Sequence, residues 1–234
     1  MNHTIPSPAG PIPLLYEDNH LLVVSKPAGL LSQEDHTGNP DLLTLCKAFI
    51  KERDQKPGNV FLGLVHRLDR PVSGVMVLAK TSKAASRISE QIRKRTVGKR
   101  YLAVVEGASP PSGYLDHHLL KDSSTNRSRV IASPRRGSKP AQLSFTTLQQ
   151  SGEHSLVEVQ LLTGRAHQIR VQLAHIGHPI AGDQKYGSGR FPTIALHARS
   201  FTLMHPTTKE EMVFVAPMPE NKPWVWFREE HRAE

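Results

Sequence analysis

The amino-acid sequence predicts an α+β fold in which a mixed, mostly antiparallel sheet is flanked by helices. Strand-like segments outnumber helix-like ones, and several of them follow one another through short turns. The segments do not alternate strictly between strand and helix, as they would in a dinucleotide-binding fold. With 234 residues and 38% hydrophobic residues, the chain is long enough to bury one sizeable core.

The elements follow from local patterns read in chain order. Residues 14–16 and 21–25 are β-rich runs on either side of a turn-forming stretch, which predicts a hairpin. Asn39-Pro40 is expected to open a helix, because a capping residue precedes a proline there and apolar residues then recur at helical spacing. The remaining strands are predicted at residues 74–80, 101–106, 114–120, 141–149, 156–162, 194–204 and 212–214, and the remaining helices at 82–95, 166–176 and from 223 onward.

Residues 1–13 are expected to form a loose leader and residues 14–234 a single domain. The longest apolar stretches are far shorter than the roughly 18 residues of a membrane-spanning helix, and no secretory signal pattern begins the chain. The single cysteine, Cys46, excludes an internal disulfide and suits a reducing compartment. A cytoplasmic protein without membrane association is therefore expected.

The charge balance favours a polyanionic partner. Thirty Lys and Arg residues against twenty-one Asp and Glu residues give a net charge of +9 and a pI of about 9.8. Residues 82–100 hold seven basic side chains and one acid, and residues 121–139 hold six and one. The alternative is an ordinary soluble basic surface, but this clustering favours contact with a phosphate backbone.

The segment at residues 66–74 places a carboxylate between two arginines. Asp69 lies between Arg67 and Arg70 in a turn that ends at Gly74, directly before an apolar strand. Loops held by rigid elements are favoured places for catalytic groups, and two flanking cations favour the ionised, nucleophilic form of a carboxylate. The alternative reading is an ordinary turn with a surface ion pair.

A second segment, at residues 162–170, combines a strand end with the start of a helix. Thr163 is expected to cap that helix, whose free N–H groups could receive a phosphate. Arg165 lies at the mouth of this turn, where its guanidinium could hold a carboxylate. A third segment, residues 182–187, is a turn that says little by itself.

Taken together, these segments resemble the RluA-type pseudouridine synthases. The matching pieces occur in family order at residues 16–18, 26–29, 66–74, 99–101 and 163–187, and they cover most of residues 14–204. Two departures, Val72 and Ala166, replace threonines that are common in the family. The resemblance implies the pseudouridine synthase catalytic fold, as a stand-alone catalytic domain without the N-terminal RNA-binding domain of many relatives.

The resemblance implies a chemistry in which uracil is detached from the ribose, rotated and rejoined through C5, with no metal, nucleotide or redox cofactor. It assigns Asp69 as nucleophile or ribose-side base, Arg165 as its partner, and Tyr101 as the ring that stacks on the flipped uracil. Arg67 resembles the residue that replaces the expelled base in the RNA stack. Further RNA contacts are expected from His66, Arg70, Lys99, Arg100, His167 and Arg170.

Alternatives remain open beside this reading. Tyr101 could be a core strand aromatic, and Arg67 a generic phosphate contact. The thirteen histidines do not predict a metal site, because His167 and His175 lie about two helical turns apart and no cysteine-rich partner exists. The expected partner is a stem-loop of ribosomal or transfer RNA, bound by a monomer, and the sequence does not choose between the two RNA classes.

Two rival functions are weighed against the enzyme. A catalytically silent RNA-binding or RNA-chaperone protein on the same fold would bind RNA without forming product. The joint presence of Asp69, Tyr101 and Arg165 argues against it. A glycosidase or nuclease with paired carboxylates lacks a second acid near Asp69 in these motifs.

Overall fold

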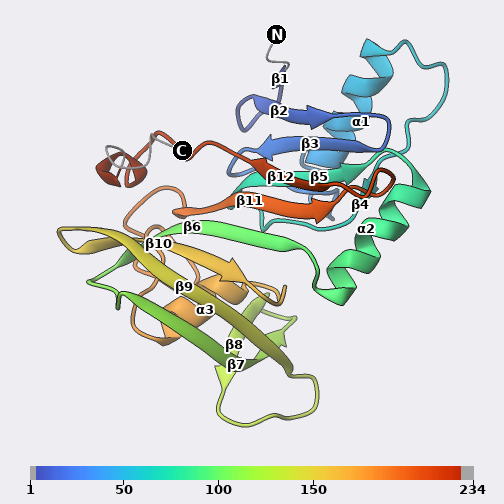
Figure 1. Cartoon of the computed structure of the whole chain (residues 1–234). Coiled ribbons are helices and arrows are strands. Elements are labelled where there is room, and N and C mark those ends of the chain that lie inside the picture. Colours follow the sequence, from blue (N-terminus) through green and yellow to red (C-terminus); the bar gives the residue numbers. More distant parts are fainter. Residues whose placement is uncertain (1–3, 228–234) are drawn as a thin grey trace. The chain divides into compact units, whose positions relative to one another are not determined.

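The computed structural model describes residues 4–227, which form two compact units (Figure 1). The first unit comprises the described residues up to Gly98 together with Ala198–Pro217, and the second comprises Lys99–His197 and the described residues from Met218 onward. The boundaries between the units fall within strands β6 (Gly98–Glu106) and β11 (Leu196–Met204). The prediction that residues 14–234 form one domain stays a prediction.

Strands of the first unit pair side by side in the order β1, β2, β3, β5, β11, with β4 on β5 and β12 on β11. The pairs β2–β3 and β3–β5 are antiparallel, which confirms the predicted hairpin. These elements are β1 (Thr4–Ile5), β2 (Ile12–Glu17), β3 (Leu21–Lys26), α1 (Leu42–Arg53), β4 (Gly63–Leu64), β5 (Ser73–Ala79), α2 (Ser82–Lys94) and β12 (Glu211–Val215).

The core of the first unit forms where α2 packs on strands β3, β5 and β11. Val23 and Val77, from neighbouring strands, pack with Ile88 of α2 and with Phe201. Thr81 caps α2 by accepting a hydrogen bond from the backbone N–H of Ala84 (3.1 Å). Ala84 and Ile88 are the buried residues of the helix. The turn at residues 66–72 lies between β4 and β5, so it leads directly into this packed sheet.

The second unit is an antiparallel sheet in the order β6, β10, β9, β7, β8. Helix α3 covers one face of it, where Val171 packs against Leu119 and Ala141. The elements are β7 (Ser112–Asp122), β8 (Arg127–Ile131), β9 (Lys139–Ser151), β10 (His154–Leu161), α3 (Gln168–His175) and the short 3₁₀ helix η1 (Trp224–Phe227). The antiparallel pairing and the three α-helices within residues 4–227 confirm the α+β expectation.

Strands β4 and β8 were not predicted, and the starts of the chain, of α1 and of α3 also differ from the prediction. Residues 4–5 pair with residues 12–13, because Ile5 and Ile12 are buried, so this part of the expected loose leader is ordered. Helix α1 is capped by Asp41, whose carboxylate accepts from the backbone N–H of Thr44 (3.0 Å), and begins later than Asn39-Pro40 predicted. Residues 1–3 of the leader lie outside the described residues. Helix α3 begins at Gln168, two residues after its predicted start.

No helix within residues 4–227 combines the length and the hydropathy of a membrane span.

Candidate active site

The turn that carries Asp69 leads directly into β5 of the first unit. The backbone N–H of Val72 donates to the carbonyl of Asp69 (3.0 Å), which closes the turn. Gly74 follows with φ of +116°, and a Cβ at this position would lie 2.2 Å from the carbonyl oxygen of Ala198 on β11. Glycine is required here for both reasons, since an L side chain would be strained and would strike backbone. The half-buried Asp69 is thus presented at a fixed place beside the sheet.

Lys26, at the end of β3, is hydrogen-bonded to the turn that carries Asp69. Its side chain is fully buried, and Nζ donates to the carbonyl oxygens of Pro27 (3.0 Å), Leu30 (2.7 Å) and Arg70 (3.1 Å). Two further bonds join the same segments, because Gly29 N–H donates to Arg70 O (2.9 Å) and Arg70 Nε donates to Gly29 O (3.0 Å). The sequence piece at residues 26–29 is therefore the support of the Asp69 turn.

The ammonium of Lys26 has a strongly altered environment. Burial lowers the pKa of Lys26 to about 7, and the charge of Asp69 acts in the opposite direction, raising it. Only an ammonium has three hydrogens, so all three carbonyl bonds are made together by the charged form. The ammonium of Lys26 therefore interacts electrostatically with the carboxylate of Asp69.

Ser32 fixes the other side of Asp69. Its buried hydroxyl donates to the carbonyl of Leu68 (2.8 Å) and accepts from the N–H of the same residue (3.2 Å). Asp69 is thus flanked by two residues, Leu68 and Arg70, whose backbones are both bonded to the segment after β3. Sequence reasoning missed Ser32, since a serine in a loop carries no local signal of a partner 36 residues away.

The predicted RNA contacts around Asp69 differ in accessibility. Arg67 and Arg70 are exposed, although Arg70 also bonds to Gly29. His66 is half-buried, its Nε2 accepts from the N–H of Val77 (2.9 Å), and its ring lies 4.6 Å from that of Phe201. His66 therefore has a structural position within the unit, while Arg67 is free of burial and can face a ligand.

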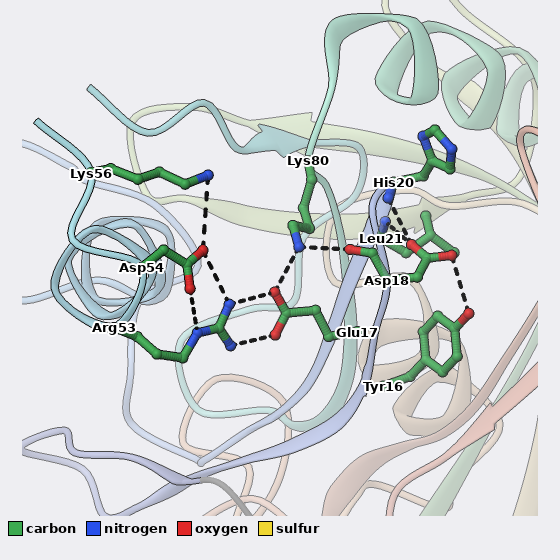
Figure 2. Close-up of polar contacts among 9 residues, drawn as sticks. All are labelled: Tyr16, Glu17, Asp18, His20, Leu21, Arg53, Asp54, Lys56 and Lys80. Carbon is green, nitrogen blue, oxygen red and sulfur yellow. Dashed lines mark hydrogen bonds and ion pairs between the residues drawn. The ribbon is translucent and has the colours of Figure 1, made fainter. Parts of the chain in front are cut away.

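The matching piece at residues 16–18 forms a polar network in the first unit (Figure 2). Glu17 accepts from the two terminal guanidinium nitrogens of Arg53 (2.6 and 2.8 Å) and from Lys80 (2.7 Å). The hydrogen bond from Arg53 holds the pKa of Glu17 below its usual value, against the opposing effect of burial. Asp18 closes the β2–β3 turn by accepting from the N–H of Leu21 (2.7 Å). Residues 16–18 thus stabilise the hairpin. The two cations that they contact, Arg53 and Lys80, are both paired with Glu17.

Strand β6 of the second unit carries the three residues 99–101 on two faces. Side chains alternate along a strand, so Lys99 and Tyr101 share one face and Arg100 lies on the other. Lys99 Nζ lies 3.9 Å from where a Cβ of Gly164 would be, and burial lowers the pKa of Lys99. Arg100 is exposed and pairs with Glu158 (3.1 Å). Of the two predicted basic contacts, only Lys99 therefore shares the face of Tyr101.

Gln168 builds the turn that carries Arg165. Its buried Oε1 accepts from the hydroxyl of Thr163 (2.8 Å) and from the N–H of Arg165 (3.0 Å), and its Nε2 donates to Gln142 O (3.0 Å). Thr163 in turn accepts from the N–H of Gln142 (2.8 Å). The prediction that Thr163 caps α3 is wrong, because its hydroxyl joins the turn to β9 instead.

The residue before α3 is His167, whose backbone is left-handed (φ 56°) and whose side chain makes no capping bond. Its Nδ1 lies 2.9 Å from the hydroxyl of Tyr186, so the ring is tied to the segment at residues 182–187. Nearby, Arg165 Nε donates to the carbonyl of Pro140 (2.9 Å). Both contacts fix the residues on either side of Ala166.

Arg170 forms a buried ion pair within the second unit. The sequence predicted an RNA contact, but the side chain is buried and pairs with Asp183 through Nε–Oδ2 (2.8 Å) and Nη2–Oδ1 (2.7 Å). Burial alone would raise the pKa of Asp183, but the bonds from Arg170 hold it below its ordinary value. Asp183 lies in the third sequence segment, residues 182–187. Its carboxylate pairs with the buried guanidinium of Arg170.

The predicted residues thus fall into two sets. Asp69, Arg67, Arg70 and His66 belong to the first unit, whereas Tyr101, Lys99, Arg165 and His167 belong to the second. The expected pairing of Asp69 with Arg165 stays a prediction. Within residues 4–227, no three histidine, cysteine or acidic side chains gather in a way that could hold a metal ion.

Comparison with known proteins gives consistent matches along the chain. A family model described as RNA pseudouridylate synthase matches residues 20–175. Ribosomal large subunit pseudouridine synthase C of Buchnera aphidicola is 38% identical over 216 residues, which cover 88% of this chain and 67% of the relative. Ribosomal large subunit pseudouridine synthase D of Nitrosomonas europaea is 35% identical over 223 residues, with coverage of 90% and 63%.

A solved structure is similar over nearly the whole chain. Human RNA Pseudouridylate Synthase Domain Containing 4 has a TM-score of 0.76 at 26% identity, with coverage of 91% of this chain and 90% of that one. The chain spans less than two thirds of the length of some of its relatives, such as the Nitrosomonas protein.

Proposed function

This chain belongs to the RNA pseudouridylate synthase family, and we propose that it isomerises a uridine of structured RNA to pseudouridine through Asp69. The observation that carries the proposal is the family match over residues 20–175, because that segment contains Asp69, Tyr101 and Arg165 together. The rigid support of the Asp69 turn by Lys26 and Ser32 is what a carboxylate needs to meet a reacting sugar or base in one geometry.

The proposed reaction breaks the bond between uracil N1 and the ribose and forms one between C5 and the same ribose carbon. The hydrogen on C5 leaves and N1 gains one, so the atoms balance without a second substrate or a cofactor. Asp69 acts as nucleophile or ribose-side base, and Tyr101 stacks on the base. Flipping a base out of RNA costs a few kcal/mol, of which stacking on an aromatic ring recovers about 1–3 kcal/mol.

Arg165 and Arg67 complete the proposed machinery. Arg165 serves as the cationic partner of the carboxylate. Gln168 accepts from its backbone N–H and Pro140 O accepts from its Nε, so both the backbone and the guanidinium are held. Arg67 is exposed beside Asp69 and fills the gap that the flipped base leaves in the stack. Lys99 and Arg70 supply further positive charge for the RNA backbone.

Ribosomal RNA is the substrate class that we propose first, with transfer RNA as the second. Two of the similar proteins are named for the ribosomal large subunit. The net charge of +9 fits any such polyanion, so the choice of RNA rests on these names alone.

The test compares pseudouridine formation by the wild type, Asp69→Asn and Asp35→Asn. Total RNA from cells lacking the gene is incubated with each protein, and pseudouridines are mapped at nucleotide resolution. We expect the wild type and Asp35→Asn, which alters an exposed carboxylate of the same unit, to restore the same sites. Asp69→Asn should fold normally and restore none. Residual isomerisation by Asp69→Asn would refute the assignment, and RNA binding without product by the wild type would indicate the silent RNA-binding protein.

A further inference from the structure

Tyr186 has a side chain that is held at one place in the second unit. Its backbone N–H donates to the carboxylate of Asp183 (3.2 Å), which is itself paired with the buried Arg170. The ring packs against the apolar cluster that includes Val171 of α3, and the guanidinium carbon of Arg170 lies 5.3 Å from the ring centroid. These contacts fix where the hydroxyl at the end of the ring lies.

The hydroxyl of Tyr186 lies between two nitrogen atoms. Its oxygen accepts from the backbone N–H of Ser128 (2.7 Å). On the other side, Nδ1 of His167 lies 2.9 Å from the same oxygen, and the two rings meet edge to face with centroids 5.7 Å apart. A backbone N–H has no lone pair and can only donate, so the hydrogen of the hydroxyl does not point toward Ser128.

Counting the hydrogens assigns the form of the His167 ring. A neutral imidazole carries a hydrogen on one nitrogen and a lone pair on the other. Of the groups that contact the Tyr186 hydroxyl within residues 4–227, only Nδ1 of His167 can accept its hydrogen. A hydrogen on Nδ1 would leave the hydroxyl with two donors and, in this part of the chain, no acceptor. Nδ1 is therefore the acceptor, and the ring carries its hydrogen on Nε2.

The hydroxyl is a lasting donor at neutral pH. Burial raises the pKa of Tyr186 above its ordinary value of 10.0, although the bond from Ser128 and the charge of Arg170 act in the opposite direction. The side chain of His167 makes no capping bond to α3, so its Nδ1 is bonded to Tyr186 and not to the helix. The ring lies two residues after Arg165 and is thus held in one orientation and one tautomer.

We propose that Tyr186 is a positioning residue that holds His167 with its hydrogen on Nε2, so that His167 meets the target nucleotide as a hydrogen-bond donor and not as a general base. The group that it meets is an oxygen acceptor of that nucleotide. This role toward the substrate rests on the proposed function, whereas the tautomer itself follows from contacts within the second unit.

The first experiment determines the tautomer by NMR of protein labelled with ¹⁵N in its histidines. The spectra are recorded at about pH 8, where an ordinary histidine with a pKa of about 6.5 is neutral. His167→Gln identifies the signals of this ring among the thirteen histidines. We expect the hydrogen on Nε2 in the wild type and a shifted Nδ1 signal in Tyr186→Phe. A hydrogen on Nδ1 in the wild type, or an Nδ1 signal that Tyr186→Phe leaves in place, would overturn the proposal.

The second experiment moves the donor atom of residue 167 and measures the single-turnover rate constant at saturating RNA. The amide nitrogen of glutamine reaches the place of Nε2, whereas that of asparagine reaches the place of Nδ1. His167→Gln should lower the rate constant about threefold and His167→Asn about thirtyfold. A structural role predicts the reverse order, because asparagine tolerates the left-handed backbone (φ 56°) better than glutamine. An asparagine variant as fast as the glutamine variant would therefore refute the donor role.

The third experiment removes the hydroxyl alone. Tyr186→Phe should lower the single-turnover rate constant about tenfold and keep RNA affinity within about twofold of the wild type. Tyr114→Phe, at an exposed position of β7 in the same unit, is the matched control and should change neither quantity. Weaker RNA binding with an unchanged rate constant would place the contact on the RNA backbone away from the target nucleotide, which contradicts the proposal. If the wild type forms no pseudouridine, the proposed function fails, while the NMR spectra still decide whether Tyr186 fixes the tautomer.

Discussion

Lys26 Nζ lies 3.1 Å from the carbonyl oxygen of Arg70, a residue 44 positions away in the sequence. The bond joins the end of β3 to the turn that carries Asp69. Two more carbonyls, those of Pro27 and Leu30, share the same ammonium, so a single buried cation organises the segment on both sides of the contact. The turn that carries Asp69 is thus bonded to a buried lysine of the neighbouring strand.

Replacing Lys26 with methionine should therefore cost both stability and activity. Methionine fills the space and removes a buried charge, but Pro27 O and Leu30 O lose the ammonium donor, while Arg70 O keeps only its bond from the N–H of Gly29. We expect a net cost of about 3 kcal/mol in unfolding free energy. Urea unfolding measures the stability, and single-turnover kinetics should show a lower rate constant at saturating RNA. Lys51→Met, at an exposed position of α1, is the control and should change stability by less than about 0.5 kcal/mol. A Lys26→Met protein with unaltered rate would mean that the turn holds its geometry without the ammonium.

The backbone at Gly74 makes a second, sharper prediction. In Gly74→Ala the added Cβ would meet Ala198 O at 2.2 Å in a left-handed backbone conformation, so β5 and β11 would have to separate. We expect a loss of at least about 4 kcal/mol, measured by urea unfolding, or failure to fold. Gly58→Ala is matched to it, because nothing lies within 4 Å of that Cβ and its φ is ordinary. That variant should be neutral or slightly stabilised.

The elements that depend mainly on local sequence patterns were predicted well from the sequence. The strand at residues 74–80 and the helix at residues 82–95 follow from apolar periodicity, and the structure confirms both within a residue. The placement of Asp69 in a turn before a buried strand also follows from neighbouring residues alone. Periodicity reports which face of an element is apolar, and that was sufficient at these positions.

Contacts between distant segments could not be predicted in this way. Arg170 was expected among the RNA contacts, yet α3 buries it against Asp183. Nothing in the local pattern shows that a carboxylate returns to that place 13 residues later. For the same reason the sequence did not predict the contact of Ser32 with Leu68. It also gave no role to Lys26, although residues 26–29 match the family.

Gln168 gives a prediction for the second unit. Its side chain makes three bonds that define the Arg165 turn. Gln168→Leu should lower the unfolding free energy by about 2–4 kcal/mol, since the N–H of Arg165 and the hydroxyl of Thr163 both lose their acceptor. Activity should fall further than stability explains, because Arg165 loses its direction. Gln150→Leu, which breaks only one bond to Ser109 away from this turn, should leave the rate constant unchanged. Equal kinetic effects of the two substitutions would argue against a role for Gln168 in placing Arg165.

The buried pair of Arg170 and Asp183 predicts how stability depends on pH. The folded-state pKa of Asp183 lies below its ordinary value of 3.8, so the unfolded chain binds a proton first as the pH falls. The contribution of the pair is therefore complete above about pH 5, declines below 3.8 and disappears as the pH passes through the folded pKa. Asp183→Asn should be destabilised by about 3–5 kcal/mol at pH 7, because the guanidinium remains buried without a carboxylate.

The difference in unfolding free energy between wild type and Asp183→Asn should then narrow as the pH is lowered from 7 toward 3. Other carboxylates with lowered pKa values, such as Glu17, titrate equally in both proteins and cancel in the difference. Urea unfolding of both proteins between pH 7 and pH 3 measures this difference in unfolding free energy. A difference that stays constant down to pH 3 would show that Asp183 has no lowered pKa, and that the charge of Arg170 is balanced in some other way.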